Sequence, residues 1–468
     1  MSDSRRLSPE GLLPLATGVL WLTSGSAAGP VGFLVALVPG CLGIASGGAL
    51  LLWEGDRRIG HYAALASLLG IVLAIPGLWA VGIWNAFFLG LLSAASFIAV
   101  GRASLRLGIP VAGVPAPENS VAMAAKVAVD EALMAHLQLS LRYPTEERAR
   151  VIAREVDEAR ALFRERGWLE KPLDYHRQPP PLLDPEIRTE RSRGIEFEHL
   201  QFESGFEPRP EEPGSARWDD WTPNQTSHAW VIRHAGPPRP WLVCINGYRM
   251  GFPLVDLRAF DPKIYHQELG LNLLMPVLPL HGPRRVGRQS GDRFLDGNLV
   301  DTVHAETQAM WDIRRLLSWV RGEGAPRIGV YGLSLGGYNA SLLSCVDSDL
   351  ACVIAGVPLT DIPGIFWHHG SPPRVRELER AGLRLEDLEE VFSVVSPLAL
   401  ESQVPPSGRM IFGGVGDRVV PAEQVRALYA HWNQPDMVWY QGGHVTFPIA
   451  AEVRAGVQQT LRETALAL

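Results

Sequence analysis

The sequence predicts two structural regions, an N-terminal group of membrane-spanning helices and an α/β domain with a mostly parallel sheet flanked by helices. Three observations support this prediction. Only four of the residues between Gly11 and Gly101 are charged, far fewer than a soluble domain carries. From about Arg193 onward, short β-rich runs alternate with helical stretches, as in parallel sheets covered by helices. Within this second region, a Gly-x-Ser-x-Gly segment lies between a strand pattern and a helix pattern.

Composition excludes several classes of protein. The chain has 468 residues, which is more than one domain needs. Its net charge of −7 argues against a nucleic-acid partner. The four cysteines form no Cys-x-x-Cys pair and no cluster with histidine at zinc spacing, so we predict neither a metal site nor a disulfide framework.

Four apolar segments predict four membrane spans, since a spanning helix needs about 20 apolar residues. They are residues 12–28, 31–53, 62–81 and 84–100. A cleaved signal peptide is an alternative for the first segment, but three more apolar segments follow it. None of the four contains Asp, Glu, Lys, Arg or His. The sequence therefore predicts an anchor in a lipid bilayer rather than a transporter, which usually needs such residues inside the membrane.

The arginines flanking the spans predict their orientation. They occur before the first span, between the second and third, and after the fourth (Arg5, Arg6, Arg57, Arg58, Arg102 and Arg106). Four spans place all of them on one side, which the positive-inside rule assigns to the cytoplasm. We therefore predict an integral protein of a bacterial cell membrane with its α/β domain in the cytoplasm. If one segment does not cross, that domain lies outside.

Residues 108–185 predict a helical connector between residues 1–107, the membrane region, and residues 186–468, the α/β domain. One helix is expected over residues 118–141. A second should begin after Thr145, whose hydroxyl can cap it, with Glu146 and Glu147 well placed in its first turn. Three consecutive prolines within residues 178–183 mark the boundary to the α/β domain.

The α/β region predicts eight strands joined by helices and loops. They are residues 195–202, 228–234, 241–245, 271–278, 327–331, 351–357, 410–413 and 437–440. The segment Gly332-Leu333-Ser334-Leu335-Gly336-Gly337 directly follows one of them and opens a helix. In this context the sharp turn exposes the Ser334 hydroxyl, and the glycines avoid collisions with the neighbouring strand and helix.

A serine nucleophile needs a base, and the base needs a group that orients it. Asp417 follows the strand 410–413, and His444 lies in a glycine-rich loop after the strand 437–440. Since α/β enzymes build their sites at the carboxyl ends of strands, Ser334, Asp417 and His444 are the predicted catalytic residues. Asp361 is the alternative acid. Other histidines fit the role of base less well (His281, His304, His368, His369 and His431).

Two backbone amides should stabilise the negative charge that develops on the substrate oxygen. One is expected from Leu335, directly after the nucleophile. The other is expected from the loop after the strand 241–245, where we favour the amide of Tyr248, with Gly247 and Arg249 as alternatives.

Residues from about 190 to 468 resemble the α/β-hydrolase fold family. The resemblance rests on the Gly-x-Ser-x-Gly turn, the Gly-x-Gly-Asp-x-x-Val-Pro segment around Asp417 and the Gly-Gly-His segment ending at His444. It is closest to single-domain esterases and to the dienelactone hydrolase and prolyl-oligopeptidase branch. It implies a serine hydrolase that needs no cofactor. Asn246 stands where the family usually has histidine, so the oxyanion site departs from the family pattern at this position.

The membrane region makes a lipid or another apolar small-molecule ester the favoured substrate. An acyltransferase, a peptidase and a catalytically inactive membrane scaffold remain alternatives, and the sequence does not define an oligomeric state. Two insertions should shape the substrate site. Residues 360–407 predict a lid with two helices, near 374–381 and 385–392, and carry Trp367. Residues 280–301 carry Arg284 and Arg285, which could bind a substrate anion or simply pair with loop aspartates.

Overall fold

The computed structural model describes residues 9–52, 56–141, 143–295 and 298–467. The chain divides into two compact units. The first comprises Met1–Leu141, Gly414–Ala422 and Trp439–Ala450, and the second Arg142–Gly413, Glu423–Val438 and Ala451–Leu468. The two helices of the predicted connector fall in different units, the first helix in the first unit and the second helix in the second unit.

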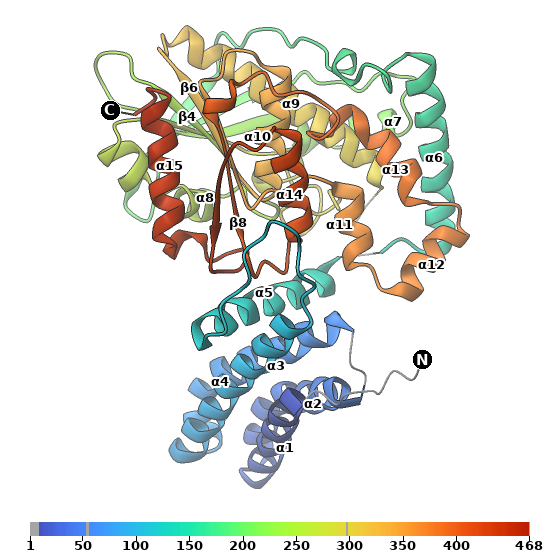
Figure 1. Cartoon of the computed structure of the whole chain (residues 1–468), viewed down its shortest axis with the longest axis vertical. Coiled ribbons are helices and arrows are strands. Elements are labelled where there is room, and N and C mark those ends of the chain that lie inside the picture. Colours follow the sequence, from blue (N-terminus) through green and yellow to red (C-terminus); the bar gives the residue numbers. More distant parts are fainter. Residues whose placement is uncertain (1–8, 53–55, 142, 296–297, 468) are drawn as a thin grey trace. The chain divides into compact units, whose positions relative to one another are not determined.

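Five helices make up most of the first unit (Figure 1): α1 (Leu12–Ala27), α2 (Pro30–Leu52), α3 (Arg57–Ala80), α4 (Ile83–Arg106) and α5 (Val121–Ser140). Three are long and apolar enough to span a membrane, over Pro30–Leu52, Arg58–Ala80 and Ile83–Arg106. Helix α1 has 16 residues, just under the shortest usual span of about 17. The count of four spans thus remains a prediction. Arg5, Arg6 and Trp53 lie outside the described residues.

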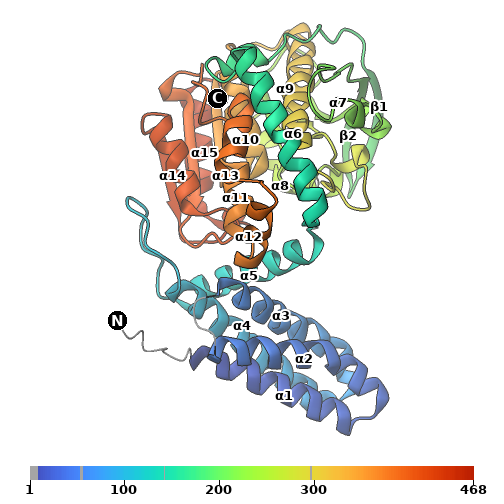
Figure 2. The ribbon, with the colours of Figure 1, turned by 90° about the vertical axis from the view of Figure 1, so that its right-hand side faces the viewer.

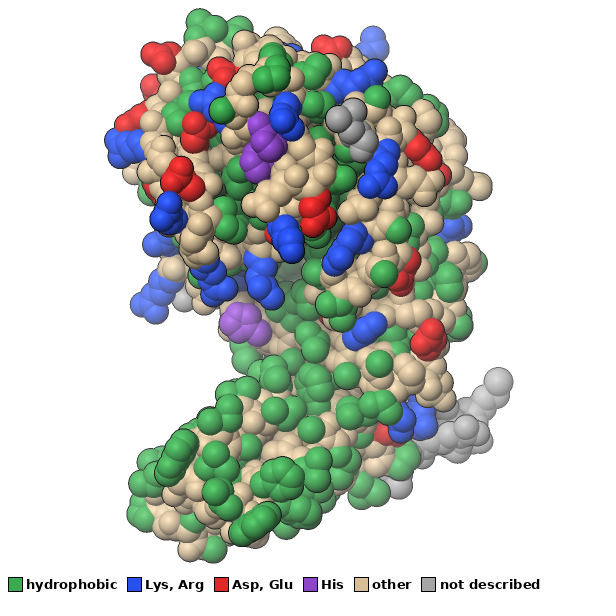
Figure 3. Space-filling model, turned by 90° about the vertical axis from the view of Figure 1, so that its left-hand side faces the viewer, with side chains coloured by type: hydrophobic (Ala, Val, Ile, Leu, Met, Phe, Trp, Pro, Cys, Tyr) green, Lys and Arg blue, Asp and Glu red, His purple; other side chains and the backbone are tan. Residues whose placement is uncertain are grey.

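Small residues allow α1 and α2 to pack closely. A Cβ atom added at Gly18 would lie 2.7 Å from the Gly40 oxygen, and one at Gly25 would lie 2.7 Å from the Gly32 oxygen. Such contacts are typical of helices that associate within membranes. Hydrophobic side chains cover the outward faces of α1 to α4 (Figure 3). Trp79 and Trp84, 83% and 82% exposed, flank the uncharged α3–α4 turn, as aromatic residues do at a membrane interface.

The start of α3 corrects one sequence-based expectation. The helix begins at Arg57, five residues before the predicted span, and therefore includes His61. The His61 side chain is buried and forms an ion pair with Glu131 of α5. The helix begins before the apolar segment because Asp56 caps its N-terminus, where the Asp56 side chain accepts a hydrogen bond from the Arg58 amide at 3.1 Å.

A nine-stranded sheet runs through the α/β region in the order β1-β2-β3-β5-β4-β6-β7-β8-β9. The strands are β1 (Glu186–Ser192), β2 (Ile195–Glu203), β3 (Thr226–Ile232), β4 (Trp241–Ile245), β5 (Asn272–Pro276), β6 (Ile328–Leu333), β7 (Cys352–Gly356), β8 (Arg409–Gly414) and β9 (Asp436–Tyr440). The eight predicted strands are present. The ninth, β1, pairs antiparallel with β2, and its polar, mostly exposed side chains left no hydrophobic pattern to detect.

Strands β5, β4, β6, β7 and β8 are parallel, and their register brings several carboxyl ends to one edge. Ile245 of β4 lies beside Gly332 of β6, and Leu333 lies beside Gly356 of β7. The loops that carry the predicted site residues leave from this edge.

Helices cover both faces of the sheet (Figures 1 and 2). A Cβ atom at Gly329 of β6 would lie 2.5 Å from Leu466, just after α15, whereas one at Gly332 would lie 1.9 Å from the Gly336 oxygen of α10 on the other face. The principal helices are α6 (Glu146–Glu165), α8 (Pro253–Ala259), α9 (Leu299–Gly322), α10 (Leu335–Val346), α14 (Ala422–His431) and α15 (Ala451–Glu463). This is the α/β-hydrolase fold, as the resemblance implied.

The insertion after β7 forms three helices, α11 (Ile362–His369), α12 (Pro372–Arg380) and α13 (Leu385–Phe392), where two were expected. Helix α11 contains a Pro-Gly pair, which usually marks a turn, but the proline lies in its first turn, where proline is tolerated. Helix α6, which is capped by Thr145 as predicted, contacts this insertion through ion pairs. Its Arg160 contacts Asp387 at 2.7 Å and Glu390 at 2.6 Å on α13.

Candidate active site

Ser334 occupies a strained turn between β6 and α10. Its φ and ψ angles are 57° and −115°, a conformation that side-chain-bearing residues rarely adopt. Two backbone hydrogen bonds to the β7 segment hold it there: the Ser334 amide donates to the Gly356 oxygen at 2.9 Å, and the Leu359 amide donates to the Ser334 oxygen at 3.2 Å. Strain held in this way is typical of functional residues.

Two glycines allow the turn to form. A Cβ atom at Gly332 would lie 1.9 Å from the Gly336 oxygen, and one at Gly336 would lie 1.9 Å from the Ile245 oxygen. Both neighbours are backbone atoms that cannot rotate away. The glycines at positions 332 and 336 are therefore required because the backbone of α10 passes close to β6 and to β4.

We expect Gly336→Ala to lower the free energy of unfolding by about 3 kcal/mol, because the added methyl must push α10 away from β4. For a domain of this size that loss lowers Tm by roughly 6–12 °C. Gly322→Ala is the matched control, since a Cβ atom at Gly322, the last residue of α9, meets nothing within 4 Å. Thermal unfolding of the purified full-length protein tests this, and equal Tm values for the two variants would contradict it.

Asp417 and His444 lie together. His444 Nδ1 is 2.7 Å from Asp417 Oδ2. The other carboxylate oxygen of Asp417 accepts hydrogen bonds from the amides of Val419, at 2.9 Å, and Val420, at 2.8 Å. These amides fix the carboxylate, and the bond at Nδ1 fixes the imidazole tautomer in which Nε2 carries the lone pair.

The surroundings of His444 favour its protonated form. Burial acts to lower the pKa of His444, but the Asp417 carboxylate, its hydrogen bond and the charge of Asp130 outweigh burial, so the pKa is raised above its ordinary value. An imidazole that accepts a proton more readily than usual is suited to act as a general base. Asp417 and His444 belong to the first unit of the chain and Ser334 to the second.

The loop after β4 lies next to Ser334. A Cβ atom at Gly247 would lie 3.5 Å from the Ser334 Cβ atom. The Gly247 amide donates to Met250 Sδ at 3.2 Å, which leaves Tyr248 and Arg249 as the candidates for the second oxyanion-binding amide. Leu335, the first candidate, is the first residue of α10. The Asn246 side chain is buried, and neither its nitrogen nor its oxygen has a hydrogen-bond partner among the described residues.

Comparison with known proteins decides the family. No protein-family model matches the chain. The uncharacterized proteins MT2702 and Rv2627c of Mycobacterium tuberculosis, from strains CDC 1551 / Oshkosh and ATCC 25618 / H37Rv, are each 42% identical to it over 357 residues. The matches cover 75% of this chain and 85% of each of those proteins. The chain belongs to the Rv2627c family.

Solved structures similar to this Rv2627c-family chain include acetyl xylan esterase 1 from Thermoanaerobacterium sp. JW/SL YS485, with 17% identity and a TM-score of 0.45 over 63% of this chain and 92% of that one. An acetyl xylan esterase from Paenibacillus sp. R4 has 16% identity and a TM-score of 0.42 over 64% of this chain and 99% of that one. A cold-adapted esterase from an Arctic intertidal metagenomic library has 16% identity and a TM-score of 0.39 over 60% of this chain and 99% of that one.

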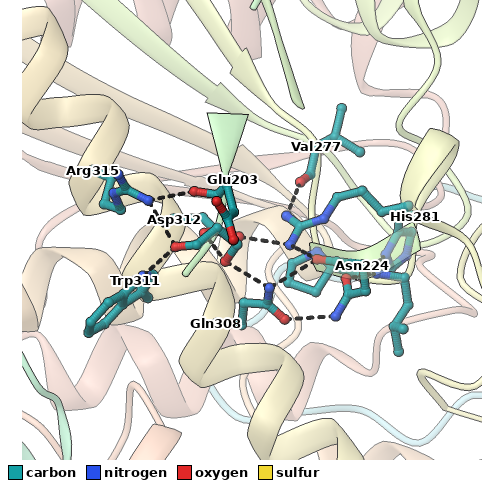
Figure 4. Close-up of polar contacts among 12 residues, drawn as sticks. Glu203, Asn224, Val277, His281, Gln308, Trp311, Asp312 and Arg315 are labelled. Carbon is teal, nitrogen blue, oxygen red and sulfur yellow. Dashed lines mark hydrogen bonds and ion pairs between the residues drawn. The ribbon is translucent and has the colours of Figure 1, made fainter. Parts of the chain in front are cut away.

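Arg284 does not face a substrate site in this Rv2627c-family member, contrary to the sequence-based expectation. Its side chain is fully buried, and its guanidinium donates to Asp312 at 2.8 Å and to the oxygens of Asn224 and Val277 at 3.0 Å. Asp312 also accepts a hydrogen bond from Ser204 at 2.6 Å. Figure 4 shows Asn224, Val277 and Asp312 within this network. The loop sequence does not reveal that Arg284 turns inward.

The two other candidate substrate residues are accessible. Arg285 is exposed and its guanidinium lies over the ring of Phe252, 5.8 Å from its centre. Trp367, on α11, is partly buried and contacts Phe366 with ring centres 5.9 Å apart. Both stay candidates for contact with a substrate.

The alternative acid and bases have other partners. Asp361 caps α11, accepting a hydrogen bond from the Gly364 amide at 2.9 Å. His281, His304 and His431 each contact a backbone oxygen through one ring nitrogen, at 2.8–2.9 Å. Of the described histidines and aspartates, His444 and Asp417 form the one pair located on loops after β8 and β9.

Sequence reasoning missed Asp130. This carboxyl group on α5 is fully buried and accepts a hydrogen bond from the amide of His444 itself. The available signal was an Asp-Glu pair in the middle of a helix that is otherwise mostly apolar. Such a pair needs partners if it is buried, but nothing in the local sequence identifies them.

Proposed function

We propose that the chain is a membrane-anchored serine hydrolase that cleaves carboxylic esters through a Ser334, His444 and Asp417 triad. The observation that carries this proposal is the buried hydrogen bond between Asp417 and His444, on the two loops where the order of a hydrolase triad requires them. The strained turn at Ser334 supports the choice of this residue as the third member. A serine hydroxyl reacts at neutral pH when such a base and orienting acid serve it.

The proposed reaction proceeds in two steps. His444 Nε2 removes the proton from Ser334 Oγ as this oxygen attacks the ester carbonyl, and the Leu335 and Tyr248 amides stabilise the oxyanion. His444 then gives the proton to the departing alcohol, leaving an acyl-serine. Water enters, loses a proton to His444 and attacks the acyl group, which releases the acid and restores the serine. Neither step needs a cofactor.

The proposed substrate is a lipid or another apolar ester, held in part by Arg285 and by Trp367 of the helical insertion. The apolar helices α2, α3 and α4 support this choice, because they would keep the domain at a bilayer surface. We further propose that the protein resides in the bacterial cell membrane with the hydrolase domain in the cytoplasm. Faster turnover of long-chain micellar esters than of short-chain soluble esters is expected, and equal turnover would contradict the lipid assignment.

Labelling with a fluorophosphonate probe tests the serine hydrolase assignment directly, because the probe reacts with activated serines. Detergent-solubilised full-length protein is expected to label, and Ser334→Ala to abolish labelling. Ser407→Ala is the control, because Ser407 is an exposed serine of the 406–408 turn, away from the Gly-x-Ser-x-Gly segment, and this variant should label like the wild type. Labelling of Ser334→Ala, or none in folded wild type, would reject the assignment.

A further inference from the structure

One carboxylate oxygen connects α5 to both loops of the acid–base pair. Asp130 Oδ2 accepts a hydrogen bond from the His444 amide at 2.6 Å and another from the Arg418 amide at 3.1 Å. The first amide belongs to the proposed base, and the second to the residue that follows the proposed acid. Asp130 is 0% exposed, and its other oxygen has no hydrogen-bond partner among the described residues.

Both loops are shaped to lie against α5. A Cβ atom at Gly443 would lie 2.5 Å from Asp130 Oδ2. One at Gly416 would lie 2.3 Å from Met123 Cε and 2.8 Å from a methyl group of Val127. The glycine that precedes each of His444 and Asp417 in the sequence therefore makes room for α5.

Helix α5 is in turn fixed to the membrane helices. Its Glu131 pairs with His61 of α3, and its backbone approaches α4 so closely that a Cβ atom at Gly101 would lie 1.9 Å from the Ala124 oxygen. The Arg418 guanidinium donates to the Ser104 oxygen of α4 at 2.7 Å. A continuous set of buried and partly buried contacts thus runs from α3 and α4 through α5 to the loops of Asp417 and His444.

We propose that Asp130 is a positioning residue for the Asp417–His444 pair, so that α5 and the membrane helices beneath it form part of the catalytic apparatus. This inference rests on the proposed function. Asp130 acts in two ways. Its hydrogen bonds set where the two loops lie, and its negative charge favours the imidazolium that forms on His444 during turnover. Burial and the neighbouring Asp417 carboxylate raise the pKa of Asp130 to about 7, so this charge is present in part at neutral pH and above.

Two substitutions separate these roles. Asp130→Ala removes both hydrogen bonds and is expected to lower kcat about 100-fold with little change in KM, since a shift of about 1 Å in a catalytic group costs that much. Asp130→Asn keeps an oxygen that can accept both amides and should recover most of the lost kcat. The Asp130→Asn variant also lacks the Asp130 charge, while Asp417 and Arg418 are unchanged. The pKa of His444 should therefore fall, and the limb of the kcat/KM profile that reports His444 should move to lower pH. Val129→Ala, at an exposed neighbouring position of α5, is the matched control.

The full-length protein in detergent is used throughout, with ester turnover and fluorophosphonate labelling as readouts. If Asp130→Ala unfolds, the pH profile of Asp130→Asn still decides the question. Wild-type kcat in Asp130→Ala, or an unmoved limb in Asp130→Asn, would overturn the positioning role while Ser334-dependent labelling persists. Failure of the proposed function looks different, because labelling would then not depend on Ser334 in any variant.

Discussion

Replacing Ser334 with alanine is expected to lower kcat for ester hydrolysis by about five to six orders of magnitude. The attacking oxygen is lost, and no described side chain in the turn can replace it. Folding should be unaffected, because the hydrogen bonds that hold this backbone involve the Ser334 amide and carbonyl, which alanine keeps. Turnover of a chromogenic ester and Tm, measured on the same full-length preparation, test both halves of the prediction.

Ser407→Ala serves as the reference for turnover, as it does for labelling. A Ser334→Ala variant that keeps more than about one hundredth of the wild-type kcat would show that the ester is cleaved by another group. A large drop in Tm would mean instead that the hydroxyl itself supports the turn.

Asp417→Asn is expected to lower kcat about 10⁴-fold. The asparagine oxygen can still accept the Val419 and Val420 amides, so the loop should keep its shape. The asparagine nitrogen would then face His444 Nδ1 and donate to it, which favours the tautomer with its proton on Nε2. That tautomer cannot accept the serine proton. Steady-state kinetics of the folded variant measure the effect.

Asp361→Asn is the control for Asp417→Asn, because Asp361 is the alternative acid and caps α11. A larger loss of kcat in Asp361→Asn than in Asp417→Asn would reverse the assignment of the acid.

The pH dependence of Asp417→Asn has a definite sign. His444 must be neutral to act as base, so kcat/KM rises with pH through its pKa. Burial lowers this pKa, while Asp417 supplies the largest of the effects that raise it in the wild type. Removing the Asp417 charge should therefore move the remaining limb of the profile to lower pH, and a move to higher pH would contradict the electrostatic role of Asp417.

Local sequence patterns predicted the strands, the helices and the turn at Ser334, because these features depend on residues close together in the sequence. The alternation of short apolar strands with helices identified the sheet, and the glycines around Ser334 identified the turn because each excludes a Cβ atom at a close backbone contact. Asp417 and His444 could be predicted as a pair because each lies in the glycine-containing loop that follows a strand. Strand β1 could not, because its side chains point into solvent and carry no hydrophobic period.

The remaining misses concern contacts between distant segments. Arg284 lies in a loop whose polar sequence suggests exposure, and only the fold shows that it is buried against Asp312 of α9. Asp130 lies in a helix whose alanine-rich sequence suggests a simple connector. Its partners follow it by 288 and 314 residues, so no pattern within one element could indicate them.

These long separations impose an order on biosynthesis. The ribosome adds about 5–20 residues per second, so Asp130 emerges roughly 15–60 s before the amides of Arg418 and His444 exist. Helices α1 to α5 therefore have time to form while the α/β region is still being translated. The loops of Asp417 and His444 are made late, so the contacts that Asp130 makes with them can form only once nearly all of the chain has been synthesised.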